Sequence, residues 1–132
     1  ADRAIIVTTP EVSAVRDADR IIGLLEAAEK NDPRLIINRI RPDMVRRGDM
    51  MDIEDIYEIL AIKLIGVVPD DEKIVTSTNK GEPAIMDNTS RASIAYRNIV
   101  RRIEGEDVPF MSLEVEDRLL DKIKRWFGGK SR

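Results

Sequence analysis

Few residues in this chain of 132 have side chains suited to catalysis. It contains no cysteine and no histidine, which excludes disulfides, thiolate metal sites, cysteine nucleophiles and imidazole general bases. The fragment Gly129-Lys130-Ser131 has the ending of a phosphate-binding loop. Such a loop also needs a glycine five positions before Gly129, at a turn between a strand and a helix. That position is Lys124, so the fragment does not predict a phosphate site.

The C-terminal residues 118–132 combine apolar and basic side chains at helical spacing. On a helix, the large apolar residues fall within an arc of about 120°; they are Leu119, Leu120, Ile123, Trp126 and Phe127. The rest of the helix surface carries Arg118, Asp121, Lys122, Lys124 and Arg125. Nine helical residues reach only about 13 Å, too short to cross a bilayer. We therefore expect this tail to lie in the plane of a membrane interface.

The charge distribution points to an anionic partner for the tail. The whole chain has a net charge of −3, but residues from Arg118 onward carry +5 and residues 1–117 carry −8. Anionic lipid attracts cations of this kind. Two alternatives remain: a final helix packed on its own domain, and a helix bound in the groove of a partner protein. The sequence has no apolar run long enough to span a membrane, and its first residues do not read as a signal peptide, so we expect a cytoplasmic setting.

Strands and helices alternate in the body of the chain. Residues 3–8, 34–40 and 63–69 are apolar runs rich in β-branched residues, typical of strands buried in a parallel sheet. The segments between them are too long for hairpins and have amphipathic stretches. The sequence predicts an α/β fold with a mostly parallel sheet and helices on both faces.

Three helices are predicted, each from a start signal and an apolar face. Thr9-Pro10-Glu11, Asp52 and Ser90 mark the three beginnings, and the last helix ends near Glu104. The side chains of the first helix expected to face the core are Ala14, Ala18, Ile21, Ile22 and Leu25. In the second helix they are Ile53, Ile56, Ile59 and Leu60. In the third they are Ala92, Ala95, Tyr96, Ile99 and Ile103.

The expected organisation is a body at 1–108, a tether at 109–117 and the amphipathic tail at 118–132. The chain opens directly on a buried-type strand and has no initiator methionine. We interpret it as the C-terminal portion of a larger α/β domain. The alternative is a small complete domain whose methionine was removed.

Several stretches taken in order resemble the MinD family of bacterial division-site ATPases. They are TPEVSAVRDADR (9–20), INRI (37–40), RRGDMMDIEDI (46–56), IGVVPDD (65–71) and NKGEP (79–83), followed by the amphipathic end. The resemblance implies the C-terminal half of a deviant Walker P-loop ATPase that uses ATP and Mg²⁺ and forms a homodimer in the ATP state. It also implies a peripheral position on the inner face of the cell membrane, recruitment of the division inhibitor MinC, and regulation by MinE or another protein. The phosphate-binding loop is absent here, so this segment alone should not hydrolyse ATP.

The resemblance assigns nucleotide-binding roles to residues that follow the predicted strands. Asn38 matches the asparagine that contacts adenine, and Pro69 and Asp70 match the loop that closes over the base. Arg39, beside Asn38, and Glu11, after the first strand, complete the expected cofactor-binding residues. The carboxyl ends of parallel strands are where such folds bind ligands, and a carboxamide can both donate to and accept from adenine. Without the resemblance, Asn38 would be interpreted as a residue that caps a turn.

The resemblance also assigns a partner surface. It comprises Ser13, Arg16, Asp17 and Asp19 on the first helix, with Met50, Asn79 and Gly81 added to it. From the residues alone, the helix positions read as a solvated polar stripe and Met50 as a packing residue. The membrane-binding residues are Leu119, Leu120, Lys122, Ile123, Lys124, Arg125, Trp126 and Phe127.

Two other functions remain open at this point. A DNA-segregation ATPase of the ParA type would share the fold, and the basic residues Arg39, Arg41, Arg46 and Arg47 could contact phosphates. The acidic body and the membrane-type tail weigh against it, so we expect no specific nucleic acid. A nucleotide-free membrane adaptor is the other alternative, with the α/β body as a protein-binding module.

Overall fold

The computed structural model describes residues 3–30, 32–81, 83 and 90–111. The elements in chain order are β1 (Ile5–Thr8), α1 (Val12–Ala27), β2 (Arg34–Ile40), α2 (Pro42–Arg46), α3 (Ile53–Leu60), β3 (Lys63–Pro69), α4 (Glu72–Lys80) and α5 (Arg91–Ile103). The membrane-binding residues predicted between Leu119 and Phe127 lie outside the described residues. Within the described ranges, no helix has the length and apolar content needed to cross a bilayer.

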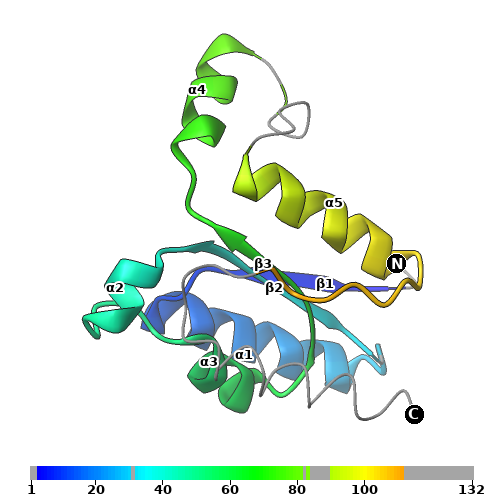
Figure 1. The fold of residues 1–132 in the computed structure, drawn as a ribbon. Helices are drawn as coiled ribbons and strands as arrows, with labels where there is room; N and C mark the ends of the chain where they lie inside the picture. The colour runs from blue at the N-terminus through cyan, green and yellow to red at the C-terminus, as the bar shows by residue number, and fades with distance from the viewer. Residues whose placement is uncertain (1–2, 31, 82, 84–89, 112–132) are drawn as a thin grey trace.

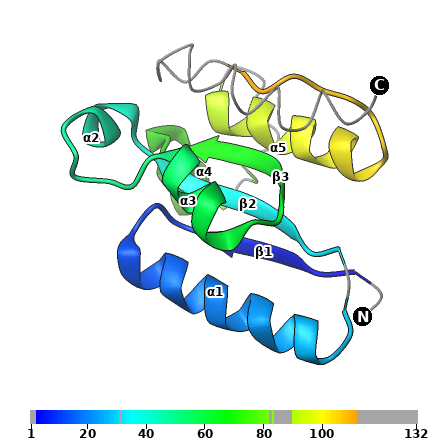
Figure 2. The same ribbon diagram turned by 90° about the horizontal axis from the view of Figure 1, so that it is seen from below.

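The three strands form one parallel sheet in the order β1-β2-β3. Figure 1 shows α1 and α3 on one face of this sheet and α5 on the other. Seen from below, α1 runs along β1 and α5 lies on the β3 side (Figure 2). The predicted α/β fold, with adjacent parallel strands and helices on both faces, is confirmed.

The core lies mainly between the sheet and the pair α1 and α3. Its buried residues are Ile6, Val15, Ala18, Ile22, Leu35, Ile37, Ile40, Ile53, Ile56, Leu60, Leu64 and Val67. A smaller cluster under α5 consists of Ile36, Ile65, Val68, Ala92, Ala95 and Ile99. Burial of these apolar side chains is the main term that holds the helices to the sheet.

Two of the predicted helix starts are confirmed by side-chain caps. The Asp52 carboxylate accepts a hydrogen bond from the Asp55 amide at 2.8 Å at the start of α3. Ser90 caps α5 by accepting from the Ser93 amide. The expectation that Thr9 caps the first helix is wrong, because α1 begins at Val12 after Glu11 and no side chain caps it. The backbone carbonyl of Thr9, not its hydroxyl, accepts from the Glu11 amide.

Three core assignments made from helical spacing are wrong. Ile21, Ile59 and Ile103 are 47%, 49% and 42% exposed. In α1 the buried stripe is Val15, Ala18 and Ile22, so the helix is rotated relative to the face that the sequence suggested. The short helices α2 and α4 were not predicted.

Arg102 fixes the chain that follows α5. Its guanidinium donates to the carbonyls of Ile65, Val108 and Pro109 at 2.8, 3.0 and 3.1 Å. The same group lies 4.1 Å from the centre of the Phe110 ring. Burial lowers the pKa of Arg102 from its usual value, and the neighbouring Arg101 lowers it further. These contacts hold residues 108–110 against β3.

Candidate functional site

The last residues of β2 depart from regular strand geometry. Ile37 pairs with Val67 and Ile40 pairs with Pro69, so β2 has one residue more than β3 between the same two pairs. The irregularity falls at Arg39, whose backbone φ is 60°. This is the left-handed region, which residues other than glycine rarely adopt. Bulges of this kind redirect side chains and are frequent beside active sites.

Asn38 lies in this bulge and is half-buried. Its carboxamide oxygen accepts a hydrogen bond from the Arg39 amide at 3.0 Å. The side chain therefore does bond to its neighbouring backbone, as the turn-capping interpretation required. Its carboxamide nitrogen has no hydrogen-bond partner within the part of the chain that the structure describes. A donor is left available at the carboxyl edge of the sheet.

The end of β3 lies directly beside this bulge. Pro69 is buried, and the Asp70 amide donates to the Ile40 carbonyl at 2.9 Å. Arg39 Nε lies 3.8 Å from Asp70 Oδ1. The Arg39 side chain is 69% exposed and that of Asp70 37%, so solvent screens this ion pair and it is worth at most about 1 kcal/mol. We call Asn38, Arg39, Pro69 and Asp70 the edge group, because all four lie at the carboxyl ends of the adjacent strands β2 and β3.

Glu11 lies apart from the edge group. It is exposed and lines a surface depression of about 480 Å³. Met50 lines the same depression, and so do Pro10 and Met51, whose amide donates to the Pro10 carbonyl at 3.1 Å. The Met50 sulfur accepts from the Arg41 amide at 3.4 Å. Of the predicted nucleotide-binding residues, Glu11 is thus the one placed with Met50, a predicted partner residue.

Acidic side chains gather beside this depression, at the start of α3. Burial raises the pKa of Asp55, and the carboxylates of Asp52 and Glu54 raise it further. All three residues belong to the cap and first turn of α3, where the positive end of the helix favours negative charge. The rim of the depression is therefore acidic.

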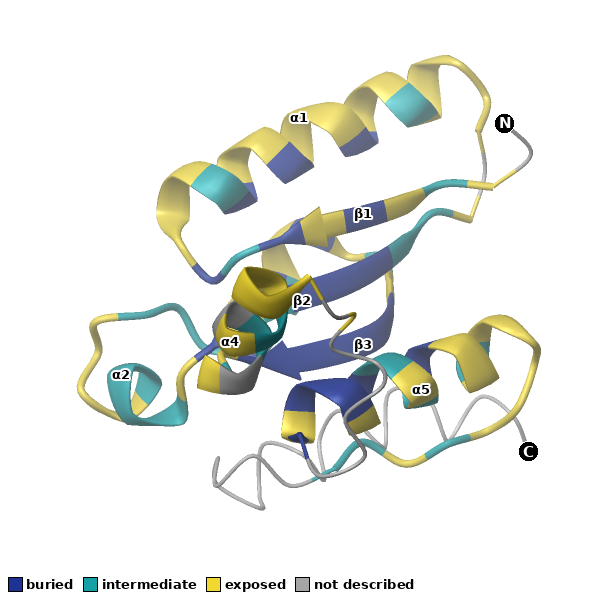
Figure 3. Cartoon of the chain, turned by 90° about the horizontal axis from the view of Figure 1, so that it is seen from above, coloured by how far each residue is buried: buried dark blue, intermediate teal, exposed yellow. Residues whose placement is uncertain are grey.

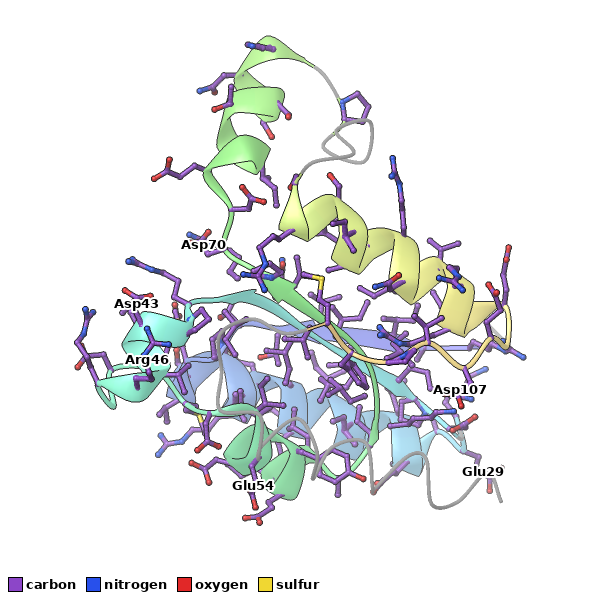
Figure 4. All side chains as sticks on the ribbon, in the orientation of Figure 1. Glu29, Asp43, Arg46, Glu54, Asp70 and Asp107 are labelled. Atoms are coloured by element: carbon purple, nitrogen blue, oxygen red, sulfur yellow. The ribbon has the colours of Figure 1, made fainter. Side chains whose placement is uncertain are left out.

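The basic cluster considered for DNA binding is largely matched by carboxylates. Arg41 and Arg47 both approach Asp43, at 3.2 and 3.7 Å, and Arg47 also pairs with Asp49 at 3.1 Å. Burial alone would raise the pKa of Asp43, but Arg41, backbone amides and Arg47 together lower it. Figure 4 shows Asp43 and Arg46 on α2 at the same end of the sheet as Asp70. This local neutralisation disfavours a phosphate-backbone contact.

The predicted partner residues fall into two separate surfaces. Ser13, Arg16, Asp17 and Asp19 are all exposed on α1. Asn79 is in α4, and Gly81 follows it with a φ of 73°. Figure 1 shows α1 and α4 on opposite sides of the sheet, so these residues do not form one continuous surface. Met50, near the start of α1, belongs with the first surface.

One polar contact beside the edge group was missed by sequence reasoning. Asp71 Oδ2 accepts from Ser90 Oγ at 2.6 Å and from the Ala92 amide at 3.3 Å. Ser90 and Ala92 are 19 and 21 positions from Asp71 in the sequence, so no local pattern predicts these hydrogen bonds. The one local signal is Ser90 itself, which marks the predicted start of a helix.

No protein-family model matches the chain, but curated relatives do. The septum site-determining protein MinD of Bacillus subtilis is 56% identical over 133 residues, which cover 99% of this chain and 50% of the relative. MinD of Synechocystis is 54% identical, over 95% of this chain and 48% of the relative. The chain is similar to MinD along almost its whole length. It spans about half the length of the MinD relatives that it matches.

Solved MinD structures have the same fold. MinD of Aquifex aeolicus, alone and in a MinC:MinD complex, superposes with a TM-score of 0.81 at 47% identity, covering 85% of this chain and 48% or 46% of the solved one. MinD of Pyrococcus horikoshii in complex with Mg-ADP superposes with a TM-score of 0.67 at 23% identity over 80% of this chain and 42% of that one. The P. horikoshii match supports the fold alone.

Proposed function

We propose that this chain is part of a MinD-type ATPase that recruits MinC to control where the division septum forms, and that the edge group binds the nucleotide base. One observation carries the proposal, in a chain 56% identical to a MinD. Asn38 lies on the β2 bulge, and the two residues after it, Arg39 and Ile40, contact the end of β3 through Asp70 and Pro69. This is the edge at which open α/β sheets bind ligands.

The edge group fits a purine base. The half-buried Asn38 carboxamide has a nitrogen that can donate to adenine N7 and an oxygen that can accept from the adenine amino group. Its oxygen already accepts from the Arg39 amide, but a carbonyl-type oxygen has a second lone pair. Pro69 and Asp70 lie on the neighbouring strand end, where they can cover the base, and Glu11 belongs to the rim farther along the edge.

The phosphates and Mg²⁺ need residues that this chain does not have. Its sequence contains no complete phosphate-binding loop. ATP hydrolysis would therefore belong to a protein of MinD length, of which this chain is about half. ATP and Mg²⁺ as the ligands of such a protein are part of the proposal.

The base-binding role is tested by Asn38→Ala in a MinD-length protein that carries this sequence. We expect binding of a non-hydrolysable ATP analogue with Mg²⁺ to weaken by about 1–3 kcal/mol, because the variant leaves a buried polar partner unpaired. Isothermal titration calorimetry measures the change. Asn98→Ala, a half-buried asparagine on α5, is the matched control. Equal affinity of the parent and a folded Asn38→Ala variant would reject the role.

The exposed polar residues of α1, with Met50, form the proposed surface for MinC. Support comes from the Aquifex MinC:MinD complex, whose MinD chain is 47% identical to this one. Ser13, Arg16, Asp17 and Asp19 stand on one exposed helix. ATP-dependent homodimerisation, regulation by MinE or another protein, and a contribution from Asn79 and Gly81 belong to the same proposal. A cytoplasmic protein that cycles on and off the inner face of the cell membrane would use these contacts in turn.

We propose that residues 118–132 are the membrane anchor of this cycle. Apolar side chains enter lipid while Lys122, Lys124 and Arg125 reach anionic headgroups. Ile123→Glu sets a charge in the middle of the apolar arc, so we expect binding to anionic vesicles to be lost while the body stays folded. Co-sedimentation of the MinD-length protein with nucleotide present measures this, and Asp121→Glu on the polar side is the control. Undiminished sedimentation of Ile123→Glu would show that the tail is not the anchor.

A further inference from the structure

Asp71 connects the edge group to two helices. Its carboxylate accepts from the Ser90 hydroxyl at 2.6 Å and from the Ala92 amide at 3.3 Å, both at the start of α5. Its backbone carbonyl accepts from the Ile74 amide at 3.0 Å, in the first turn of α4. One residue thus holds the first turns of both helices.

The contact with α5 is built into the interior of the protein. Ser90 is 1% exposed, and its hydroxyl oxygen also accepts from the Ser93 amide at 3.3 Å. The first turn of α5 contains no acidic residue of its own. The Asp71 carboxylate therefore supplies the negative charge that the positive end of this helix favours. Asp71 precedes Ser90 by 19 residues in the sequence.

Asp71 is joined by a single peptide bond to the edge group. Asp70 is tied to β2 through its amide, which donates to the Ile40 carbonyl, and through its carboxylate, which faces Arg39. Pro69 is the last residue of β3 and is buried. The position of Pro69 and Asp70 over the proposed base is thus set by β2 on one side and by the α5 start on the other.

We propose that Asp71 is a positioning residue for nucleotide binding: its bonds to Ser90 and Ala92 hold the Pro69–Asp70 segment at the distance from Asn38 that the base requires. This inference rests on the proposed function of the edge group. Asp71 itself does not touch the base. Without the Asp71 carboxylate, the Pro69–Asp70 segment is less ordered before the nucleotide binds. Part of the binding free energy must then order this segment, so affinity falls although no contact to the nucleotide is removed.

The test compares two helix-capping aspartates in a MinD-length protein that carries this sequence. Asp71→Ala removes the contact to α5. Asp52→Ala, the control, removes the cap of α3 on the other face of the sheet. Both should lower the melting temperature, since each removes a cap. We expect only Asp71→Ala to weaken binding of a non-hydrolysable ATP analogue with Mg²⁺, by roughly fivefold or more, the usual scale of coupling between an ordered segment and a site.

Two further variants separate positioning from a general loss of structure. Asp71→Asn keeps a side-chain oxygen that can accept from Ser90 and Ala92, so its affinity should lie between those of the parent and Asp71→Ala. Ser90→Ala removes the donor and should weaken binding in the same direction. If Asp71→Ala does not fold, these two variants decide the question by the same criterion.

The outcomes distinguish this inference from the function on which it rests. Weaker binding by Asn38→Ala together with unchanged binding by Asp71→Ala, or by Asp71→Asn and Ser90→Ala, overturns the positioning role and leaves the base site standing. An equal loss of affinity in Asp52→Ala also overturns it, since the effect would then follow stability alone. If Asn38→Ala binds as tightly as the parent, the base site is wrong and the positioning role falls with it.

Discussion

The two faces of the sheet are covered to different extents. Helices α1 and α3 close one face over the buried residues of all three strands. On the other face α5 covers β3 and part of β2, and the β1 side chains Ile5 and Val7 stay 45% and 58% exposed. Figure 3 shows that buried and exposed residues alternate along β1. We call the side of the sheet covered by α1 and α3 the closed face, and the opposite side, where β1 is uncovered, the open face.

The open face is informative because the β1 sequence is apolar on both sides. Strands of this kind are buried on both faces in parallel sheets. Ile6 and Thr8, which point to the closed face, are 8% and 4% exposed. The chain spans about half the length of its MinD relatives, and we expect the remaining length of such a protein to cover Ile5 and Val7.

The largest expected effect comes from the same substitution on each face. Ile56 is fully buried under the closed face, and Ile56→Ala should lower the free energy of unfolding by about 2–5 kcal/mol, through lost burial and the cavity left behind. Ile5→Ala on the open face should cost less than about 1 kcal/mol, because this side chain is already half in water. Urea denaturation of the chain measures both. Similar costs at the two sites would contradict the difference between the faces.

A smaller effect tests how closely α5 packs where it does cover the sheet. A Cβ added at Gly66 of β3 would overlap Cγ1 and Cδ1 of the buried Ile99 on α5. Gly66→Ala should therefore cost about 1–3 kcal/mol through overpacking. In an Ile99→Ala background the same change should cost less, and a double-mutant cycle of urea midpoints measures the coupling. Strictly additive costs would show that α5 can move away freely.

The smallest effect is a pH dependence at the edge of the closed face. Because the pKa of Asp55 is raised, the folded protein keeps a proton there that the unfolded chain has released. Stability from this group therefore falls as pH rises from the unfolded pKa, about 3.9, through the folded one. Asp55→Asn removes this fall.

The urea midpoint of Asp55→Asn relative to the parent should rise across that window and then stay constant up to neutral pH. Glu58→Gln, an exposed carboxylate on the same helix, is the control. A difference between Asp55→Asn and the parent that does not change with pH would refute the linkage.

The sequence was sufficient for the features that depend on local pattern. The strands and the helix starts at Asp52 and Ser90 follow from apolar runs and short-range spacing. Parallel strand order places Asn38, Pro69 and Asp70 at the same edge of the sheet, while their roles come from the family resemblance. The helix α2 is only five residues long, and α4 carries mostly polar residues, so neither produces an amphipathic stripe. These two helices were missed for that reason.

Features set by tertiary contacts could not be predicted. Ile21 and Val15 both belong to the broad apolar side of α1, and only the packing of the helix on the sheet decides that Val15 is buried. The left-handed backbone at Arg39 arises from the register between β2 and β3. The Asp71–Ser90 bond links residues 19 apart, and no local signal in the sequence specifies it.

The order of the strands in space is also their order along the chain, and this has a consequence for synthesis. Ile5 pairs with Arg34, 29 residues later, and Arg34 pairs with Lys63 after another 29. Among the strands that the structure describes, each one that leaves the ribosome after β1 therefore finds its neighbour already made, and none has to insert between two others. The sheet can grow from β1 to β3 during translation, which shortens the time that unpaired strand edges are exposed to aggregation.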